Sequence, residues 1–142
     1  MTHFESEEDR AIERDSFNRL EKIWGGTIYQ FPPHSQIDGI WVDKESHPRA
    51  LLEHKRRNDH YPSMWLACRK YVALTLLADH LEVKPIWVVR FPHPAELHWI
   101  NVWKLNDRIV TMGGRDDRGA TSDHEPVIWV PLAKMKKVNL DE

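Results

Sequence analysis

Two acidic residues and one lysine have the types and spacing needed to bind a divalent cation and act on a phosphate ester. Asp38 is separated by 14 residues from Glu53, and Lys55 follows two positions later, at the end of the segment Arg49–Lys55 (RALLEHK). In an extended strand the side chains alternate between faces, so Glu53 and Lys55 point the same way, about 6.6 Å apart along the chain. A carboxylate and an ammonium that end an apolar run are costly to desolvate without partners.

A polar turn in the sequence predicts which residue lies opposite Glu53. The segment Asp43–Pro48 separates two apolar runs, and a hairpin centred on this turn places Asp38 opposite Glu53. Two carboxylates with Cβ atoms about 5 Å apart repel each other, whereas a divalent cation between them is bound by hard oxygen ligands. The pattern therefore favours a metal site, with Lys55 placed to assist an attacking water or to stabilise charge at a phosphate. Without Asp38, a simple salt bridge between Glu53 and Lys55 would be the better interpretation.

The elements that must position these residues follow from periodicity, capping and turn residues. Ser6 and the acidic residues after it begin an amphipathic helix that Gly25-Gly26 ends. The apolar residues of a second helix cover more than half of its circumference, which predicts that it is largely buried. The expected helices are Glu7–Trp24 and Tyr61–Leu81, and the expected strands are Thr27–Phe31, Ile37–Val42, Arg49–Lys55, Ile86–Phe91, His98–Leu105, Arg108–Met112 and Val127–Val130. This order predicts an α/β (α+β) fold with a single mixed β-sheet and flanking helices.

The pattern D-x(14)-E-x-K, between a first helix and a second long helix, resembles the PD-(D/E)XK nuclease superfamily. The chain is similar in particular to small phage and prophage members and to nucleases like the Holliday-junction resolvases. The resemblance covers about residues 13–105, most of the chain. It implies a restriction-endonuclease-like αβββαβ core, an order that the periodicity of the sequence also predicts, followed here by C-terminal strands.

The resemblance also implies roles for individual residues. Asp38 and Glu53 take the positions of the metal ligands, and the backbone carbonyl of His54 that of a further ligand. Lys55 takes the position of the catalytic lysine. Many resolvase-like members add a glutamate from the first helix, for which Glu13 is the better match. The chain departs from the family pattern in having no proline before Asp38.

Basic residues near this motif are candidates for binding the nucleic-acid backbone, because guanidinium and ammonium groups fit phosphate oxygens. A solvated loop or a hairpin turn is the alternative interpretation for several of them. The candidates are Arg56, Arg57, Arg69, Lys70 and Arg115. The Gly- and charge-rich loop from Gly113 to Glu125, which holds the last of them, has no assigned role.

Composition limits the remaining possibilities. The 142 residues fit one domain, 1–142. With 20 basic and 22 acidic residues the net charge is −2. This charge excludes a protein whose whole surface is basic and coats nucleic acid, but it does not exclude a local basic patch. One cysteine and the absence of an H-E-x-x-H motif argue against a zinc site of the common types. The longest apolar stretch, Val72–Ala78, is far too short to span a membrane, and the acidic start differs from a signal peptide.

These observations predict a cytoplasmic, Mg²⁺-dependent nuclease of a bacterial or phage-infected host cell that hydrolyses DNA phosphodiester bonds, with Mn²⁺ able to substitute. An endonuclease is favoured over an exonuclease or a dimeric junction resolvase. The partner is DNA, not a membrane, and a homodimer is left open. The alternative from a different class is a non-catalytic module of nuclease-like fold that binds nucleic acid or a protein.

Overall fold

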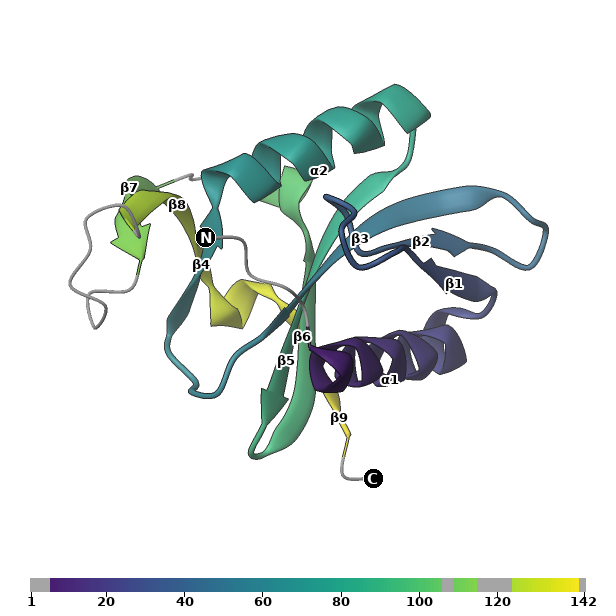
Figure 1. The fold of residues 1–142 in the computed structure, drawn as a ribbon, viewed down its shortest axis with the longest axis horizontal. Helices are drawn as coiled ribbons and strands as arrows, with labels where there is room; N and C mark the ends of the chain where they lie inside the picture. Colours follow the sequence, from purple (N-terminus) through teal and green to yellow (C-terminus); the bar gives the residue numbers. More distant parts are fainter. Residues whose placement is uncertain (1–5, 106–108, 115–123, 141–142) are drawn as a thin grey trace.

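The computed structural model describes residues 6–105, 109–114 and 124–140. Figure 1 shows a mixed sheet with a helix on each side and a small second sheet next to it. The α+β class with a mixed sheet and flanking helices is confirmed, and the two helices and the strands of the six-stranded sheet follow the expected αβββαβ order. One detail differs from the expectation of a single sheet, because three of the strands form a separate antiparallel sheet.

The first helix, α1 (Glu7–Trp24), has the bounds that the sequence predicts. The side-chain oxygen of Ser6 accepts a hydrogen bond from the Asp9 N–H at 3.0 Å, which satisfies one of the free donors at the start of the helix. Phe17 and Leu20 point from α1 into the sheet and are fully buried. This apolar stripe fixes the helix on one face of the sheet.

Three antiparallel strands follow as the predicted meander. The chain enters it through Gly26 at φ 69°, where a Cβ atom would lie 2.2 Å from the backbone oxygen of Val42, so the connection requires glycine. The second and third strands pair Gly39 with Leu52, which is the register expected from the turn, and the register shifts only beyond Trp41. The bounds are β1 (Thr27–Gln30), β2 (Gly39–Val42) and β3 (Pro48–Arg56).

The rest of the six-stranded sheet extends from β3. Strand β5 (Lys84–Pro92) runs parallel to β3, and a parallel pair needs a long crossover, which α2 (Cys68–Leu81) provides. Strand β6 (Ala95–Asn101) returns antiparallel, and β9 (Lys136–Asn139) closes the edge. The predicted strand His98–Leu105 is therefore displaced: β6 starts earlier, and its expected end is the short 3₁₀-helix η1 (Val102–Lys104).

The prediction of one helix over Tyr61–Leu81 is wrong in its first third. Ser63–Ala67 forms strand β4, which pairs with a C-terminal strand. Met64 and Leu66 are buried and Trp65 is less so, an alternation of period two that the surrounding helical pattern concealed. Pairing with a strand far away in the sequence decided the local structure here.

The helix α2 is also less buried than predicted. Among its residues only Leu74 and Ala78 are buried, both against the sheet. Val72 is 49% exposed and Leu76 66% exposed, so the wide apolar surface of this helix faces solvent in part. The reason is that α2 is an outer layer, covered by the sheet on one side only.

The second sheet has the order β4-β8-β7. It comprises β7 (Ile109–Gly114) and β8 (His124–Pro131) besides β4, and a 3₁₀-helix, η4 (Leu132–Lys134), leads from β8 to β9. The strands predicted near residues 108–112 and 127–130 correspond to β7 and β8.

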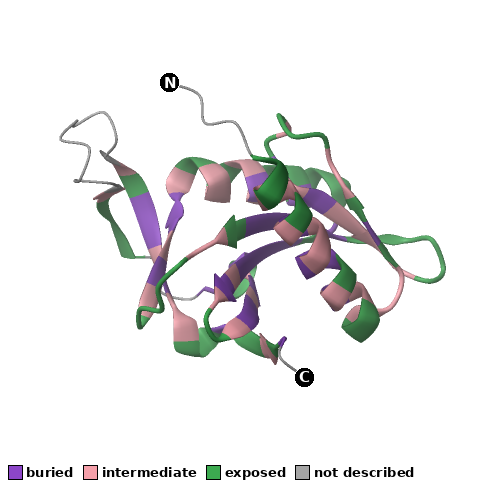
Figure 2. Cartoon of the chain, turned by 60° about the horizontal axis from the view of Figure 1, so that its bottom comes forward, coloured by how far each residue is buried: buried purple, intermediate pink, exposed green. Residues whose placement is uncertain are grey.

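Side chains of the central strands alternate between two cores. Leu52 and Val88 pack with α1, whereas Leu51 and Val89 pack with α2 and the second sheet. Figure 2 shows buried central strands and exposed outer faces of both helices. Among the described residues, no helix combines the length and the apolar character needed to cross a membrane.

Candidate functional site

Glu53 lies on β3 on the face covered by α2, as its alternation with Leu52 and His54 predicts. Its side chain is buried, with the residue 6% exposed. Glu53 Oε1 is 3.2 Å from the Nζ atom of Lys70 on α2. Glu53 Oε2 has no hydrogen-bond partner among the described residues. A buried carboxylate oxygen without a partner is costly, which suits this atom to bind a cation.

Asp38 precedes β2 and is held against β3 from both its backbone and its side chain. Its N–H donates to the Leu52 carbonyl at 3.0 Å, and its Oδ2 accepts from the His54 N–H at 2.7 Å. The carboxylate therefore lies beside the Glu53-His54 peptide. Burial and, next, repulsion by Asp38 raise the pKa of Glu53 to about 8, although the positive charges of Lys70 and Lys55 oppose this.

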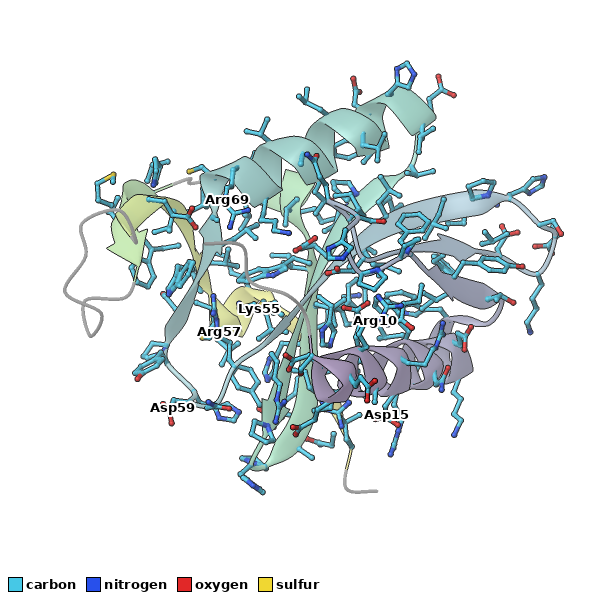
Figure 3. All side chains as sticks on the ribbon, in the orientation of Figure 1. Arg10, Asp15, Lys55, Arg57, Asp59 and Arg69 are labelled. Carbon is cyan, nitrogen blue, oxygen red and sulfur yellow. The ribbon has the colours of Figure 1, made fainter. Side chains whose placement is uncertain are left out.

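Lys55 follows Glu53 by two residues on β3, so the two side chains point to the same face of the sheet. Desolvation, with a smaller contribution from the positive charge of Arg57, lowers the pKa of Lys55, and the carboxylate of Glu53 opposes this shift. Part of the side chain remains exposed to solvent, so a substrate can reach it. Figure 3 shows Lys55 and Arg57 on the same half of the molecule as Arg69 at the start of α2. The structure thus gathers two acids and two lysines at the end of β3.

The donor set fits a divalent cation that prefers oxygen. Two carboxylates lie side by side, one just before β2 and one on β3, and one oxygen of Glu53 is unpartnered among the described residues. Mg²⁺ is bound by one or two protein carboxylates and keeps water or phosphate oxygens at its other positions. Asp38 and Glu53 are therefore the residues that would hold it.

The His54 side chain lies on the opposite face of the sheet, as expected. Its Nε2 is 2.9 Å from Ser16 Oγ on α1, and its ring meets Phe17 edge-on. Burial, followed by the positive charge of Arg90, lowers the pKa of His54 to about 3, so the ring is neutral near pH 7. A role for the His54 backbone carbonyl as a ligand stays a prediction.

Glu13 is buried on α1 rather than on the solvated face of that helix, with 1% exposure. Its Oε1 accepts a hydrogen bond from the Gln30 side chain at 2.9 Å. Gln30 pairs with Gly39, the residue after Asp38. Gln30 therefore links the buried Glu13 carboxylate to the strand that begins next to Asp38, and the role of Glu13 in the site stays a prediction.

The two arginines after Lys55 differ in their surroundings. Arg56 turns toward α1 and pairs with Asp9 at 3.1 Å and Glu8 at 3.3 Å. The structure therefore does not bring Arg56 to the carboxylates of Asp38 and Glu53. Arg57 stacks on the Trp65 ring, 4.3 Å from its centroid, and donates to the Trp65 carbonyl at 2.9 Å. Burial lowers the pKa of Arg57 to about 10. Its buried Nε has no partner among the described residues.

The two basic residues of α2 also separate. Lys70 reaches Glu53, whereas Arg69 pairs with Glu125 on β8 at 3.0 Å. Of these two candidates, Lys70 is thus the one that lies over the carboxylates of the site. Arg115, predicted to contact nucleic acid, lies outside the described residues.

One further cluster, formed by His60, Glu96 and His98, is not predicted from the sequence. Its signal in the sequence is the Glu96-x-His98 spacing, because two residues apart on a strand share a face. The periodicity starts the strand only at His98, so it leaves Glu96 outside the strand.

The comparisons with known proteins agree with this geometry. The model of the family described as "Phage putative PDDEXK endonuclease" matches residues 1–138. The chain belongs to this family of phage PDDEXK nucleases. The D…E-x-K pattern of Asp38, Glu53 and Lys55 lies just before β2 and on β3 of this nuclease, and its role as the family motif stays a prediction.

The fold of this PDDEXK nuclease is also found among solved structures. It is similar to Hjc, a Holliday junction resolvase from Archaeoglobus fulgidus, at 15% sequence identity and a TM-score of 0.57. The match covers 86% of this chain and 82% of the resolvase chain. At this identity the likeness concerns the fold. No curated protein sequence matches the chain.

Proposed function

We propose that this protein is a Mg²⁺-dependent endonuclease that hydrolyses DNA phosphodiester bonds, with Mn²⁺ able to substitute. The observation that carries the proposal is the buried Glu53 carboxylate, which lies beside Asp38 and Lys70 and has one oxygen without a partner among the described residues. Membership of the phage PDDEXK family supports the nuclease class. We propose the cytoplasm of a bacterial or phage-infected host cell as its location.

In this proposal Asp38 and Glu53 hold the cation, together with the backbone carbonyl of His54. When bound, a divalent ion supplies Lewis-acid stabilisation of the phosphoryl oxygens and lowers the pKa of water. The His54 N–H fixes the orientation of the Asp38 carboxylate through the 2.7 Å hydrogen bond. Glu13, from the first helix, completes the acidic site in the manner of the resolvase-like nucleases.

Lys55 orients the attacking water and stabilises negative charge at the scissile phosphate. Its lowered pKa supports this role, because a less strongly held proton is exchanged more readily. Lys70, whose Nζ lies 3.2 Å from Glu53 Oε1, would contribute positive charge for the phosphate beside the site. Arg57 and Arg69 are the described arginines best placed to contact the DNA backbone, because they lie on the same half of the molecule as Lys55.

The experiment is DNA cleavage with Mg²⁺, with Mn²⁺ and with EDTA. Glu53→Gln and Lys55→Ala should each lower the cleavage rate by at least about 100-fold, since each removes charge stabilisation at the reacting phosphate. The matched controls are Glu45→Gln and Lys44→Ala, which alter the same residue types in the exposed turn between β2 and β3. Full activity of the Glu53 or Lys55 variant would refute the proposal.

The substrate panel separates the remaining alternatives. Linear, circular, single-stranded and branched DNA distinguish endonuclease, exonuclease and junction-selective cleavage. The fold shared with a resolvase supports the inclusion of branched DNA, and a monomer in light scattering would argue against a dimeric resolvase. DNA binding without cleavage of any substrate would favour the non-catalytic binding module.

A further inference from the structure

A second cluster of metal-ligating side chains lies on the same face of the sheet as Glu53, two strands away. Glu96 and His98 come from β6, and His60 comes from the loop between β3 and β4. The sheet register places His98 next to Val89 and Val89 next to Lys55. At about 4.8 Å per strand, the cluster is about 10 Å from Lys55, so it is distinct from the Asp38–Glu53 site.

The ligand atoms of this cluster already converge. The Nε2 atoms of His60 and His98 are each 2.8 Å from Glu96 Oε1. All three ligand atoms lie within 4.8 Å of one another. For metal–ligand bonds of about 2.0–2.1 Å in a tetrahedral site, ligand atoms are about 3.3 Å apart. Each N···O pair thus needs to open by only about 0.5 Å to admit an ion.

The surroundings hold the ligands in place. Stacking on Phe91, with ring centroids 3.9 Å apart, fixes the His60 ring, and the residues Glu96 and His98 are 4% and 5% exposed. Lys137 lies 3.4 Å from Glu96 Oε2, which leaves Oε1 to face the two imidazoles. The His60 imidazole therefore ties the loop after β3 to β6.

The protonation of the histidines allows a switch from hydrogen bonds to a metal. In the metal-free cluster the Glu96 oxygen accepts from both Nε2–H groups. The buried His98 Nδ1 has no partner among the described residues, so no hydrogen bond at Nδ1 favours one tautomer over the other. Moving the proton from Nε2 to Nδ1 frees the Nε2 lone pair for a metal, and a metal–nitrogen bond then replaces the Nε2–H···Oε1 hydrogen bond.

We propose that His60, Glu96 and His98 bind one Zn²⁺ ion, with water at the fourth position. Two imidazoles and one carboxylate suit Zn²⁺, whereas Mg²⁺ prefers oxygen ligands only. The side chain of His60 is 29% exposed, which gives water access to the site. The ion ties the loop after β3 to β6 and thereby fixes the end of the strand that carries Glu53 and Lys55. This role in holding the loop is separate from the proposed cleavage chemistry.

The test is Zn²⁺ titration of the full chain by calorimetry in excess Mg²⁺, which fills carboxylate sites. Wild type should bind one equivalent, and Co²⁺ used as a spectroscopic probe should show the visible absorption of a four-coordinate ion. His60→Ala should weaken Zn²⁺ binding by at least about 100-fold, since loss of groups that merely support a ligand already costs about 10–100-fold. His98→Gln should do the same. The matched control is His47→Ala, which removes an imidazole from the exposed hairpin turn and should leave binding unchanged.

Circular dichroism and thermal unfolding in EDTA establish that the variants fold. Zn²⁺ should then raise the melting temperature of wild type and of His47→Ala, but not that of His60→Ala. Three results would each overturn the proposal: no Zn²⁺ binding by wild type, equal binding by His60→Ala, or binding that is lost in Asp38→Asn but kept in His60→Ala. The last result would place the ion at the nuclease site instead.

Discussion

The buried carboxylate of Glu53 should make the metal-free protein less stable as the pH rises. In the folded state the pKa of Glu53 is about 8, against an ordinary value of 4.5, because of burial and the nearby Asp38. Between these values the folded chain keeps a proton that the unfolded chain has lost. The folded state therefore binds more protons, and its stability falls as the pH rises through this window. Glu53→Gln removes the ionisable group while keeping its size.

The size of the effect follows from the same two values. At about 1.4 kcal/mol per pH unit, ionising Glu53 in the folded protein costs up to about 5 kcal/mol. Water entering around the charged side chain reduces this cost, so we expect about 2–5 kcal/mol between pH 4.5 and pH 9. This is a large part of the 5–15 kcal/mol by which typical domains are stable.

The assay is urea unfolding in EDTA at several pH values, followed by far-UV circular dichroism. The free energy of unfolding of wild type should fall relative to that of Glu53→Gln from pH 4.5 to pH 9. Every other titrating group is common to both proteins, so the difference isolates Glu53. Mg²⁺ should restore stability to wild type at high pH, because the ion binds the ionised carboxylate and the folded state only, and should have little effect on the variant.

Parallel curves for the two proteins would refute the reasoning. They would mean that Glu53 ionises in the folded state as easily as in the unfolded chain, so that the site has no need of a cation. A parallel result in EDTA together with a large Mg²⁺ effect would place the ion elsewhere.

Two further perturbations test neighbours of Glu53. Lys70→Met removes an ammonium that the cation must displace, so at pH 9 it should strengthen Mg²⁺ binding by up to about fivefold in calorimetry. The control is Arg69→Met, on the same helix but paired with Glu125, which should leave the affinity for Mg²⁺ unchanged. Because burial lowers the pKa of His54 to about 3, the unfolded chain binds a proton below pH 6.5 that the folded chain refuses, and stability falls as the pH is lowered. From pH 7 to 4.5, wild type should lose about 2–3 kcal/mol relative to His54→Gln in urea unfolding, and equal losses would contradict a buried, neutral imidazole.

The parts of the fold that depend on local sequence were predictable. The bounds of α1 follow from the Ser6 cap, the apolar stripe and the glycine stop. The β2–β3 register follows from the length of the turn, and it alone brings Asp38 to the end of β3. The placement of Asp38 beside Glu53 could therefore be predicted from the sequence alone, because hairpin geometry is decided within about twenty residues.

The parts that depend on distant partners were not predictable in the same way. Ser63–Ala67 has the pattern of the first part of a helix, and only β8, about sixty residues later, supplies the opposite strand. The exposed side of α2 carries apolar residues, so its sequence has the pattern of a buried helix face. The sequence does not tell which layer of the fold lies outermost. For the same reason His60 could not be joined to Glu96 and His98, since only the tertiary fold brings that loop to β6.

The position of Lys70 is an intermediate case, because topology determines it. Strands β3 and β5 are parallel, so the chain must return from the end of β3 to the start of β5 through α2. The helix therefore begins over the end of β3, where Glu53 and Lys55 stand, and ends near Lys84 at the start of β5. A basic residue in the first turn of this helix that faces the sheet must meet the carboxylates. The positive end of the helix dipole points the same way, so the crossover concentrates positive charge at the place where a phosphate would meet the metal site.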